Sequence, residues 1–415
     1  MLHHFLKPIQ KFRKSYLPGI VTGSADDDPS AVSTYSVVGA TTGFSQLWLL
    51  VLSTPLVIAI QNMSARIGDV AKKGLITLIK EHFGHSAALT SVVVLVVVNL
   101  ATLLADIVGM AAGLQLLTGE SYLYFIVPLI ILVWYIIVFN NYQLIAKYFF
   151  WFSGFFLAYV ASGILARPDW LAVFSSIVIP KINFNLSYAV GAIALLGTTI
   201  SPYAFFWQTS EEIEEGRDRR QIKQTNRSIT LGFIWSNLIS FFIIVTCASV
   251  ILDSHISLAN LSIKEIAQAL SPLAGGWAAK LFGVGLVGSG LLAIPILATS
   301  SAYAVAEFFR WPEGLSKKPS RAKGFYSVIS IGFILCLAAL VLDLDPIKIM
   351  FYSQILVGIL TPLIIYFILQ IAGNKKILGN YCCSRWSIFG GWLTIVLLLV
   401  GDIFLIYYLC WPRHV

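Results

Sequence analysis

The chain has 415 residues, of which 58% are hydrophobic and 12% are charged, and its formal net charge is +8. A soluble globular protein carries roughly 25% charged residues, so this composition excludes that class and predicts an all-α polytopic membrane protein without a separate soluble domain. The five cysteines form no CxxC pair, which argues against both a zinc site and a disulfide framework.

Three regions are expected along the chain. Residues 1–16 are basic, and no short apolar stretch with a small-residue cleavage site follows them, so we expect a retained cytoplasmic segment. Residues 17–371 form a core of ten spans, and residues 372–415 hold an eleventh span and the C-terminus. Each apolar run of about 20 residues can cross a roughly 30 Å hydrocarbon layer. The spans are predicted at about 17–41, 44–67, 88–117, 122–139, 147–166, 186–209, 228–252, 277–309, 324–343, 346–371 and 387–411.

The first span contains three consecutive carboxylates and a proline, Asp26 to Pro29. A carboxylate at the centre of a membrane helix costs roughly 2.5–3.5 kcal/mol, and proline removes a backbone donor from the helix. Such an interruption persists only where it lines a cavity or is buried in protein. The pattern predicts a broken helix whose carboxylates are directed at a cation.

The sixth span has a second interruption, which runs from Gly197 to Gln208 and includes Ser201 and Pro202. Spans 1–5 and 6–10 would then be inverted repeats with a break at the start of each. Two interrupted spans in corresponding positions of two repeats point to a binding site at the middle of the membrane. A pair of proline kinks without a ligand is the alternative, but it leaves Asp28 unexplained.

The Lys and Arg residues are distributed very unevenly between the predicted loops. With the N-terminus inside, 22 of the 28 fall on the cytoplasmic side. The positive-inside rule therefore predicts a cytoplasmic N-terminus and an outside C-terminus in a bacterial-type plasma membrane. The net charge then reflects topology and contact with anionic lipid, and not binding of nucleic acid.

At both breaks the sequence resembles the Nramp family of divalent-metal transporters, which have the LeuT-type fold. The family's Asp-Pro-Gly-Asn motif corresponds to residues 28–31, and its Ala-Thr-Ile-Met-Pro-His motif corresponds to residues 198–203. Further similar landmarks lie at Gln61, at Asp106 and at Ser353-Gln354. The resemblance implies a 5+5 inverted repeat plus one extra helix, with broken helices 1 and 6.

Several positions depart from the family pattern. The metal-ligating Asp is retained as Asp28 and the tenth-span Gln as Gln354, but Ala31 stands at the ligating Asn, Ser201 at the ligating Met and Tyr203 at the His after the proline. Two further family positions that carry protons are not ionisable here, because they fall at Leu103 and Gln208. The resemblance is therefore to a divergent branch, as the family's magnesium-transporting relatives also are.

The remaining donors are all oxygen atoms. A thioether favours softer transition ions, whereas Mg²⁺ dehydrates reluctantly and is usually held by one or two carboxylates with water. The set therefore favours Mg²⁺, with Mn²⁺ next, as a transported substrate, and no cofactor is expected. The predicted metal site comprises the Asp28 carboxylate, carbonyls near Ala25 and Thr198, the Ser201 hydroxyl, the Gln354 amide and space for water beside Ala31.

Four other residues are candidates for proton or vestibule roles. Asp106 could carry a proton, supply a second carboxylate or bond between helices. Successive helical residues point about 100° apart, so Asp26 or Asp27 is expected in a vestibule or protonated. Tyr203 is a poor proton carrier because tyrosine ionises far above neutral pH. We expect weak or absent proton coupling.

The leading hypothesis is a secondary transporter that moves a divalent cation by alternating access. The alternative is a LeuT-type carrier of a small organic cation or amino acid, with Asp28 holding its ammonium or a coupling ion. Against it, the first break is acidic, whereas bare helix N-termini suit a substrate carboxylate. An enzyme is not expected, since no nucleotide loop, nucleophile elbow or HExxH motif is present. The expected partners are the divalent cation and the lipid bilayer, with no obligate protein partner.

Overall fold

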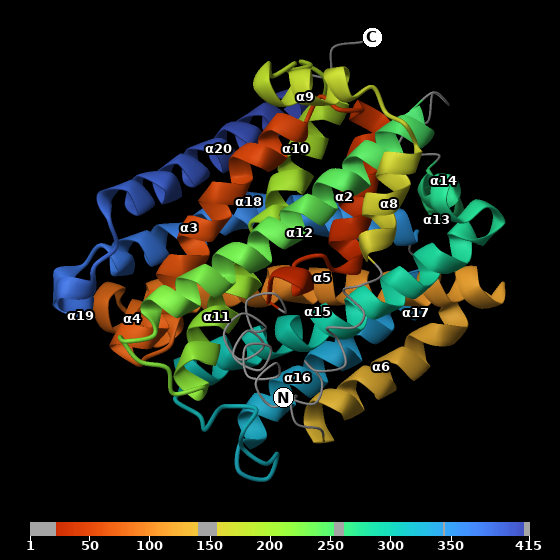
Figure 1. Cartoon of the computed structure of the whole chain (residues 1–415). Helices are drawn as coiled ribbons and strands as arrows, with labels where there is room; N and C mark the ends of the chain where they lie inside the picture. Colours follow the sequence, from red (N-terminus) through yellow and green to blue (C-terminus); the bar gives the residue numbers. More distant parts are fainter. Residues whose placement is uncertain (1–21, 140–155, 253–260, 343–344, 411–415) are drawn as a thin grey trace, which may run out of the picture.

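The computed structural model describes residues 22–139, 156–252, 261–342 and 345–410, and within these ranges all regular structure is helical. Figure 1 shows long helices crossing one another in a single bundle. The helices of the first half are α2 (Pro29–Thr42), α3 (Leu47–Ala71), α4 (Leu75–Phe83), α5 (His85–Thr118), α6 (Leu123–Phe139), α8 (Leu157–Leu165) and α9 (Trp170–Val178).

The second half begins with the two parts of the sixth predicted span and ends with the eleventh. Its longer helices are α10 (Leu186–Thr199), α11 (Pro202–Glu214), α12 (Ile222–Val250), α15 (Ala278–Phe309), α16 (Lys323–Leu335), α18 (Pro346–Ala372) and α20 (Arg385–Cys410). Its short helices are α13 (Ile263–Ala267), η4 (Gln268–Leu270), α14 (Ser271–Ala274), η5 (Gly275–Trp277), η6 (Cys336–Ala338), α17 (Ala339–Leu342), α19 (Lys375–Leu378) and η7 (Gly379–Tyr381).

Within the described ranges, eight helical stretches are long and apolar enough to cross a membrane, and α6 is a shorter apolar helix. Residues 17–21 of the first predicted span and 147–155 of the fifth lie outside the described residues, so eleven spans remain a prediction. The helix of the seventh span begins six residues earlier than predicted, at Ile222 rather than 228. The short helices α4, α9 and α13 lie between the predicted spans and were not predicted.

Both predicted breaks are present. Residues 22–25 are helical, the chain then leaves the helix, and α2 begins at Pro29 with Asp28 as its N-cap. In the second break α10 ends at Thr199 and α11 begins at Pro202, with Ser201 in the N-cap position. An N-cap residue followed by proline at the first helical position is a strong helix-start signal, because the missing N–H of proline costs no bond there.

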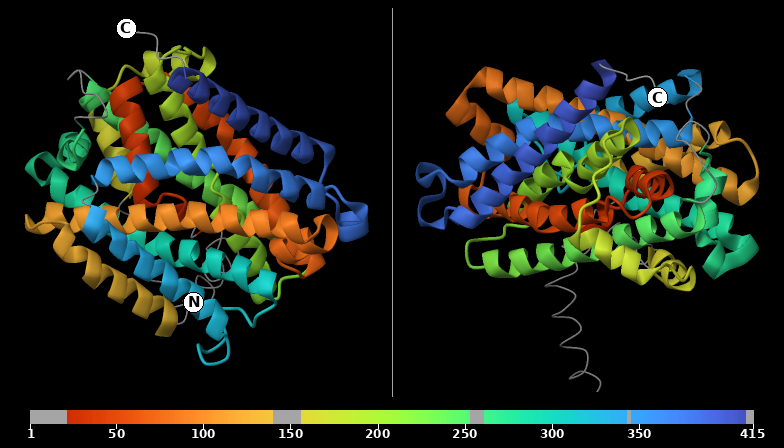
Figure 2. Two further views of the ribbon diagram at one scale, coloured as in Figure 1. Left: turned by 180° about the vertical axis from the view of Figure 1, so that it is seen from behind. Right: turned by 90° about the horizontal axis from the view of Figure 1, so that it is seen from above.

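The breaks are enclosed by long helices. α5 lies along α15, α18 packs beside α5, and α6 and α16 pack outside this group, as Figure 2 shows. The α5–α15 contact depends on glycine: a Cβ on Gly113 would lie 2.8 Å from the Gly283 carbonyl, and one on Gly283 would lie 2.5 Å from the Gly113 carbonyl. The two backbones therefore approach too closely for larger residues.

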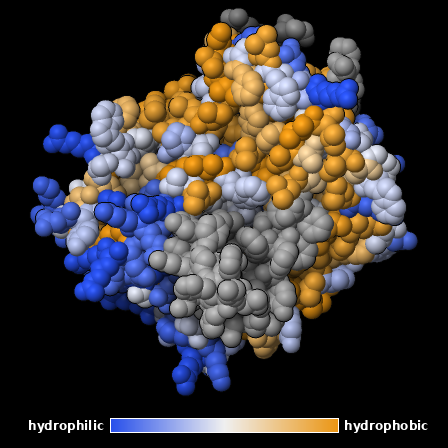
Figure 3. Space-filling model, in the orientation of Figure 1, coloured by the Kyte–Doolittle hydropathy of each residue, from blue (hydrophilic) through white to orange (hydrophobic). Residues whose placement is uncertain are grey.

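The charged loops converge at one end of the molecule. Lys80 on α4 donates to the Phe308 carbonyl at the end of α15 over 2.7 Å, and the Arg219 guanidinium lies 5.3 Å from the centre of the Tyr381 ring. Figure 3 shows hydrophilic side chains gathered at this end and hydrophobic ones over much of the rest of the visible face. This separation suits a protein with one charged end in water and an apolar belt in lipid.

Candidate functional site

Asp28 lies at the end of the first break, directly before α2, and is 2% exposed. Its Oδ1 accepts a hydrogen bond from the Ala31 N–H over 2.6 Å, which is the capping bond of α2. Its Oδ2 accepts a longer bond, 3.4 Å, from the Tyr203 hydroxyl on α11. The capping bond fixes the carboxylate at the positive N-terminal end of α2, while its second oxygen faces the other break.

The second break meets the first through its side chains and carbonyls. The Tyr203 hydroxyl donates to the Ala25 carbonyl over 3.2 Å, and the Ser201 hydroxyl donates to the Thr198 carbonyl over 2.9 Å. Ala25 and Thr198 lie where the helical turns before the breaks end, and such ends expose carbonyls that lack helical partners. The structure thus joins Ala25, Asp28 and Tyr203 in one set of contacts and Ser201 and Thr198 in another.

The three neighbouring carboxylates have different surroundings. Asp26 lies beside Ser201 and near Asp28. Asp27 is directed at α12, where its Oδ1 accepts hydrogen bonds from Ser236 and Ser240. All three are at most 3% exposed. The break therefore presents two carboxylates toward α11 and one toward α12.

Asp106 on α5 is fully buried and bonds between helices. Its Oδ1 accepts hydrogen bonds from the Ser30 N–H over 3.1 Å and from the Ser30 hydroxyl over 2.6 Å. Its Oδ2 has no hydrogen-bond partner, and Asp28 lies close enough to interact with it electrostatically. The interhelical hydrogen bond foreseen for this residue is present, and a proton role stays a prediction.

Gln354 on α18 is 1% exposed. Its amide donates to the adjacent Ser353 hydroxyl over 3.4 Å, and no hydrogen bond described for the structure joins it to Asp28. The α18 backbone at Gln354 nevertheless packs directly against Gly197, at the end of α10. The structure places Gln354 next to the second break without placing its amide among the carboxylates.

Carboxylates alone do not form a metal site here. In the part of the chain that the structure describes, no group of three or more His, Cys, Asp or Glu side chains is arranged as metal ligands. A cation at the breaks would therefore need carbonyl and hydroxyl oxygens beside one or two carboxylates. That donor set suits hard, oxygen-preferring cations such as Mg²⁺ and Mn²⁺.

The charge of the interior is strongly unbalanced. Among the described residues, nine Asp and Glu side chains are buried and no Lys, Arg or His is. None of the ion pairs in the described ranges involves the four carboxylates at the breaks, Asp26, Asp27, Asp28 and Asp106. Because an unpaired buried charge is costly, these groups require a cation or protons to offset them.

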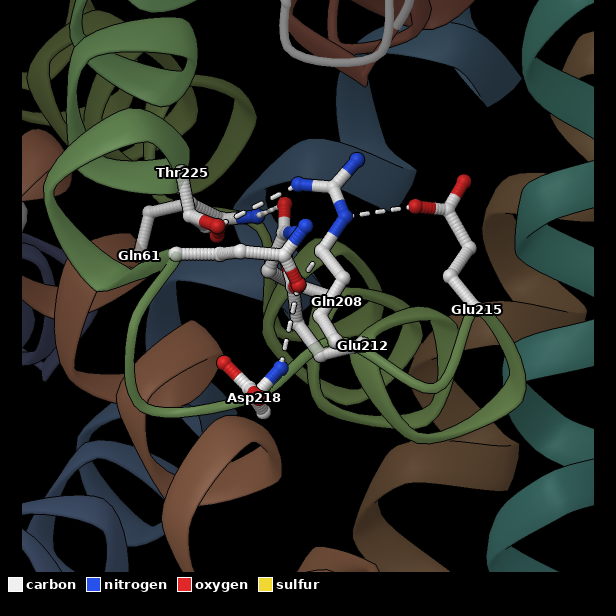
Figure 4. A network of polar contacts seen from close by, with 8 residues as sticks. Gln61, Gln208, Glu212, Glu215, Asp218 and Thr225 are labelled. Carbon is white, nitrogen blue, oxygen red and sulfur yellow. Dashed lines mark hydrogen bonds and ion pairs between the residues drawn. The ribbon is translucent and has the colours of Figure 1, made fainter.

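A polar network extends from the second break to the charged end (Figure 4). The Gln61 amide donates to Gln208, whose own amide donates to Glu212 over 2.7 Å. Arg217, in the following loop, lies 3.5 Å from Glu212 and 2.6 Å from Glu215. Burial alone would lower the pKa of Arg217, but Glu212 and Glu215 raise it above its ordinary value. A permanently charged group thus terminates the network.

Three side chains that hold the carboxylates were not identified from the sequence. Ser236 and Ser240 are four residues apart, so they share one face of α12, and polar residues at that spacing in an apolar span are a detectable signal. Ser30 carried no such signal, because its bond to Asp106 joins positions that are 76 residues apart.

The sequence from residue 19 to residue 408 matches the family model described as natural resistance-associated macrophage protein-like, or Nramp. The chain belongs to the Nramp family. The match includes both breaks and nearly the whole chain, so it confirms the resemblance seen in the motifs. The assignment is to a family of membrane transporters for divalent metals, and it excludes an enzyme.

Curated relatives of this Nramp protein are distant but match along their length. The divalent metal cation transporter MntH of Klebsiella pneumoniae (strain 342) is 23% identical over 393 residues, which cover 92% of this chain and 91% of the relative. The MntH of Yersinia pestis (strain Pestoides F) is 24% identical over 404 residues, which cover 95% of each. Identity this low fits the divergence seen at the breaks.

Solved structures show the same fold. The Eremococcus coleocola manganese transporter in complex with an aromatic bis-isothiourea substituted compound matches with a TM-score of 0.77 at 18% identity, over 96% of this chain and 87% of that one. MhsT in complex with L-phenylalanine matches with a TM-score of 0.59 at 12% identity, over 93% and 98%. These likenesses confirm the predicted LeuT-type fold and at such identities concern the fold alone.

Proposed function

We propose that this Nramp protein is a secondary transporter that moves a divalent metal cation by alternating access, with Mg²⁺ preferred and Mn²⁺ next. The observation that carries the proposal is that the possible ligand atoms near Asp28, at the two helix breaks, are oxygens. Asp28 contributes the carboxylate, and Ala25, Thr198 and Ser201 contribute carbonyl and hydroxyl oxygens. Gln354 is proposed to join from α18.

Charge balance supports a divalent substrate. Asp26 and Asp28 lie on the side of the first break that faces α11, and together they offset two positive charges. Ala31 and Ser201 are smaller than the Asn and Met of the family motif, so the site has room for water on the cation. Retained water favours Mg²⁺, which gives up its hydration shell reluctantly.

Tyr203 is proposed to regulate access to these donors. In the described arrangement its hydroxyl donates to the Ala25 carbonyl and contacts Asp28, so it occupies oxygens that a cation would use. Binding of the cation would turn the hydroxyl away or recruit its oxygen as a ligand. Either change would link ion binding to the relative position of the two broken helices, because Tyr203 connects them.

We further propose inward transport with a cytoplasmic N-terminus. The loops that carry most of the Lys and Arg lie together at the charged end, where Lys80 contacts Phe308 and Arg219 contacts Tyr381. Such a concentration at one membrane face supports the cytoplasmic assignment of that end.

The first prediction tests Asp28. In proteoliposomes offered Mg²⁺, Mn²⁺, Cd²⁺ or Ca²⁺, the wild type should take up Mg²⁺ and Mn²⁺ best. Asp28→Ala should weaken metal binding measured by calorimetry by about 100-fold or more, because removing even an outer partner of a metal ligand costs 10–100-fold.

Asp402→Asn is the matched control, because it removes another buried acid, on α20 and outside the ten-span core. Uptake should persist in that variant. Metal uptake at the wild-type rate in Asp28→Ala would remove Asp28 from the site and with it the proposed mechanism.

A further inference from the structure

Asp27 has surroundings that the proposed metal site does not use. It is 1% exposed, and its Oδ1 accepts hydrogen bonds from the hydroxyls of Ser236 and Ser240, over 3.0 and 3.1 Å. Its Oδ2 has no hydrogen-bond partner. A buried carboxylate oxygen without a partner is costly, so this atom indicates a missing positive group.

Further hydroxyl oxygens surround this carboxylate. The Tyr35 hydroxyl on α2 lies near Asp26, Asp27 and Ser240. It also forms a 3.0 Å hydrogen bond with the Thr199 hydroxyl at the end of α10. The cluster therefore draws oxygens from the first break, α2, α10 and α12. Uncharged hydroxyl oxygens with one carboxylate form a hard donor set.

Asp27 is the carboxylate that the two serine hydroxyls of this cluster contact directly. Asp26 lies beside Ser201 and also near Asp27 and Tyr35, whereas Asp28 is held by Ala31 and Tyr203. No base is buried in the described part of the chain, so none offsets Asp27 from the interior. One positive charge would balance Asp27, whereas Asp26 and Asp28 together call for two.

We infer that Asp27, Ser236 and Ser240 form a second cation site, separate from the one around Asp28, which takes a hard monovalent cation such as Na⁺. Asp27 and Asp28 are consecutive residues of one break, so a cation bound at either position alters the conformation and field felt at the other. Linkage then requires each ion to change the affinity for the other by the same factor. The monovalent ion would thus drive or regulate transport of the divalent one.

The test measures binding of ²²Na⁺ to the purified full-length protein in choline buffer. The wild type should bind Na⁺ saturably, and Na⁺ should raise its unfolding temperature. Ser236→Ala combined with Ser240→Ala should weaken binding by about tenfold or more, because two oxygen partners of the ion are lost. Asp27→Asn should abolish it.

Ser249→Ala is the matched control, since the Ser249 hydroxyl lies on the same helix and donates only to its own helix, at the Val245 carbonyl. This variant should bind Na⁺ as the wild type does. Asp28→Ala should also retain Na⁺ binding while losing the divalent metal, which separates a failure of this inference from a failure of the proposed function.

Three outcomes would overturn the inference. The first is the absence of saturable Na⁺ binding in the wild type, with no stabilisation by K⁺ or Li⁺ either, which would assign a proton to Asp27. The second is binding that survives Asp27→Asn in a folded variant. The third is binding that disappears in Asp28→Ala but not in the serine variant, which would place the ion in the metal site.

Discussion

At the scale of single residues, the proposed site lacks a soft ligand because Ser201 stands where the family has methionine. Ser201 is 3% exposed and Ala31 is fully buried, so a larger side chain at either position must be accommodated inside the protein. Replacing both, as Ser201→Met with Ala31→Asn, should shift selectivity from Mg²⁺ toward Mn²⁺ and Cd²⁺ by about tenfold, because a thioether prefers softer ions. Competition uptake in proteoliposomes measures the ratio.

Ser201→Leu with Ala31→Asn controls for size, because leucine is about as large as methionine and has no sulfur. Overpacking costs about 1–3 kcal/mol in either variant, so both should lose some stability. Only the methionine variant should gain Cd²⁺ preference. An unchanged selectivity ratio in that variant would contradict the coordination argument.

At the scale of elements, the second break depends on close contact between α10 and α18. A Cβ on Gly197 would collide with the Gln354 carbonyl and with the backbone of Gly358. Gly197→Ala should therefore destabilise the protein by about 1–3 kcal/mol and reduce uptake, because backbone atoms cannot move aside as a flexible side chain can. Thermal unfolding in detergent and metal uptake are the measurements.

Gly285→Ala on α15 provides the comparison, since a Cβ there meets nothing within 4 Å. It should leave stability unchanged or raise it slightly, because alanine is the better helix former. If both variants unfolded at the wild-type temperature and transported normally, the α10–α18 contact would not position the break.

Both breaks could be predicted from the sequence because their signals are local. Asp28-Pro29 and Ser201-Pro202 each combine an N-cap residue with a proline, and neither signal depends on the rest of the fold. The partners of the carboxylates could not be read in the same way. Asp27 meets Ser236 across 209 residues of sequence, and only the packing of α12 against the break brings them together.

At the scale of the whole molecule, no continuous chain of ionisable groups leads from Asp28 toward the charged end within the residues that the structure describes. The position on α5 to which the resemblance assigns a proton role is Leu103, which is buried. The polar path along α11 passes through the neutral amides of Gln208 and Gln61. We therefore predict weak or absent proton coupling. Uptake would then draw on the membrane potential, worth about 4.6 kcal/mol for a double charge at 100 mV.

The measurement is the internal pH of proteoliposomes during metal uptake, recorded beside metal influx at several potentials. Protein-free liposomes with a protonophore serve as the control for the pH probe. Influx should increase with an inside-negative potential without matching acidification. Stoichiometric acidification that disappears in Asp106→Asn would show that Asp106 alone carries protons, and the prediction would be wrong.

The excess of acids over bases in the interior also bears on the kinetics of the cycle. When its ions are bound, the interior of the carrier is nearly neutral while the protein changes between its outward-facing and inward-facing conformations. Without ions, the same change takes place with uncompensated negative charges at the middle of the membrane. The unloaded return is then the slower half of the cycle. During inward transport it carries those negative charges outward, so an inside-negative potential accelerates it. Such a protein exchanges labelled metal across the membrane faster than it accumulates it, and it passes current more readily in one direction than in the other.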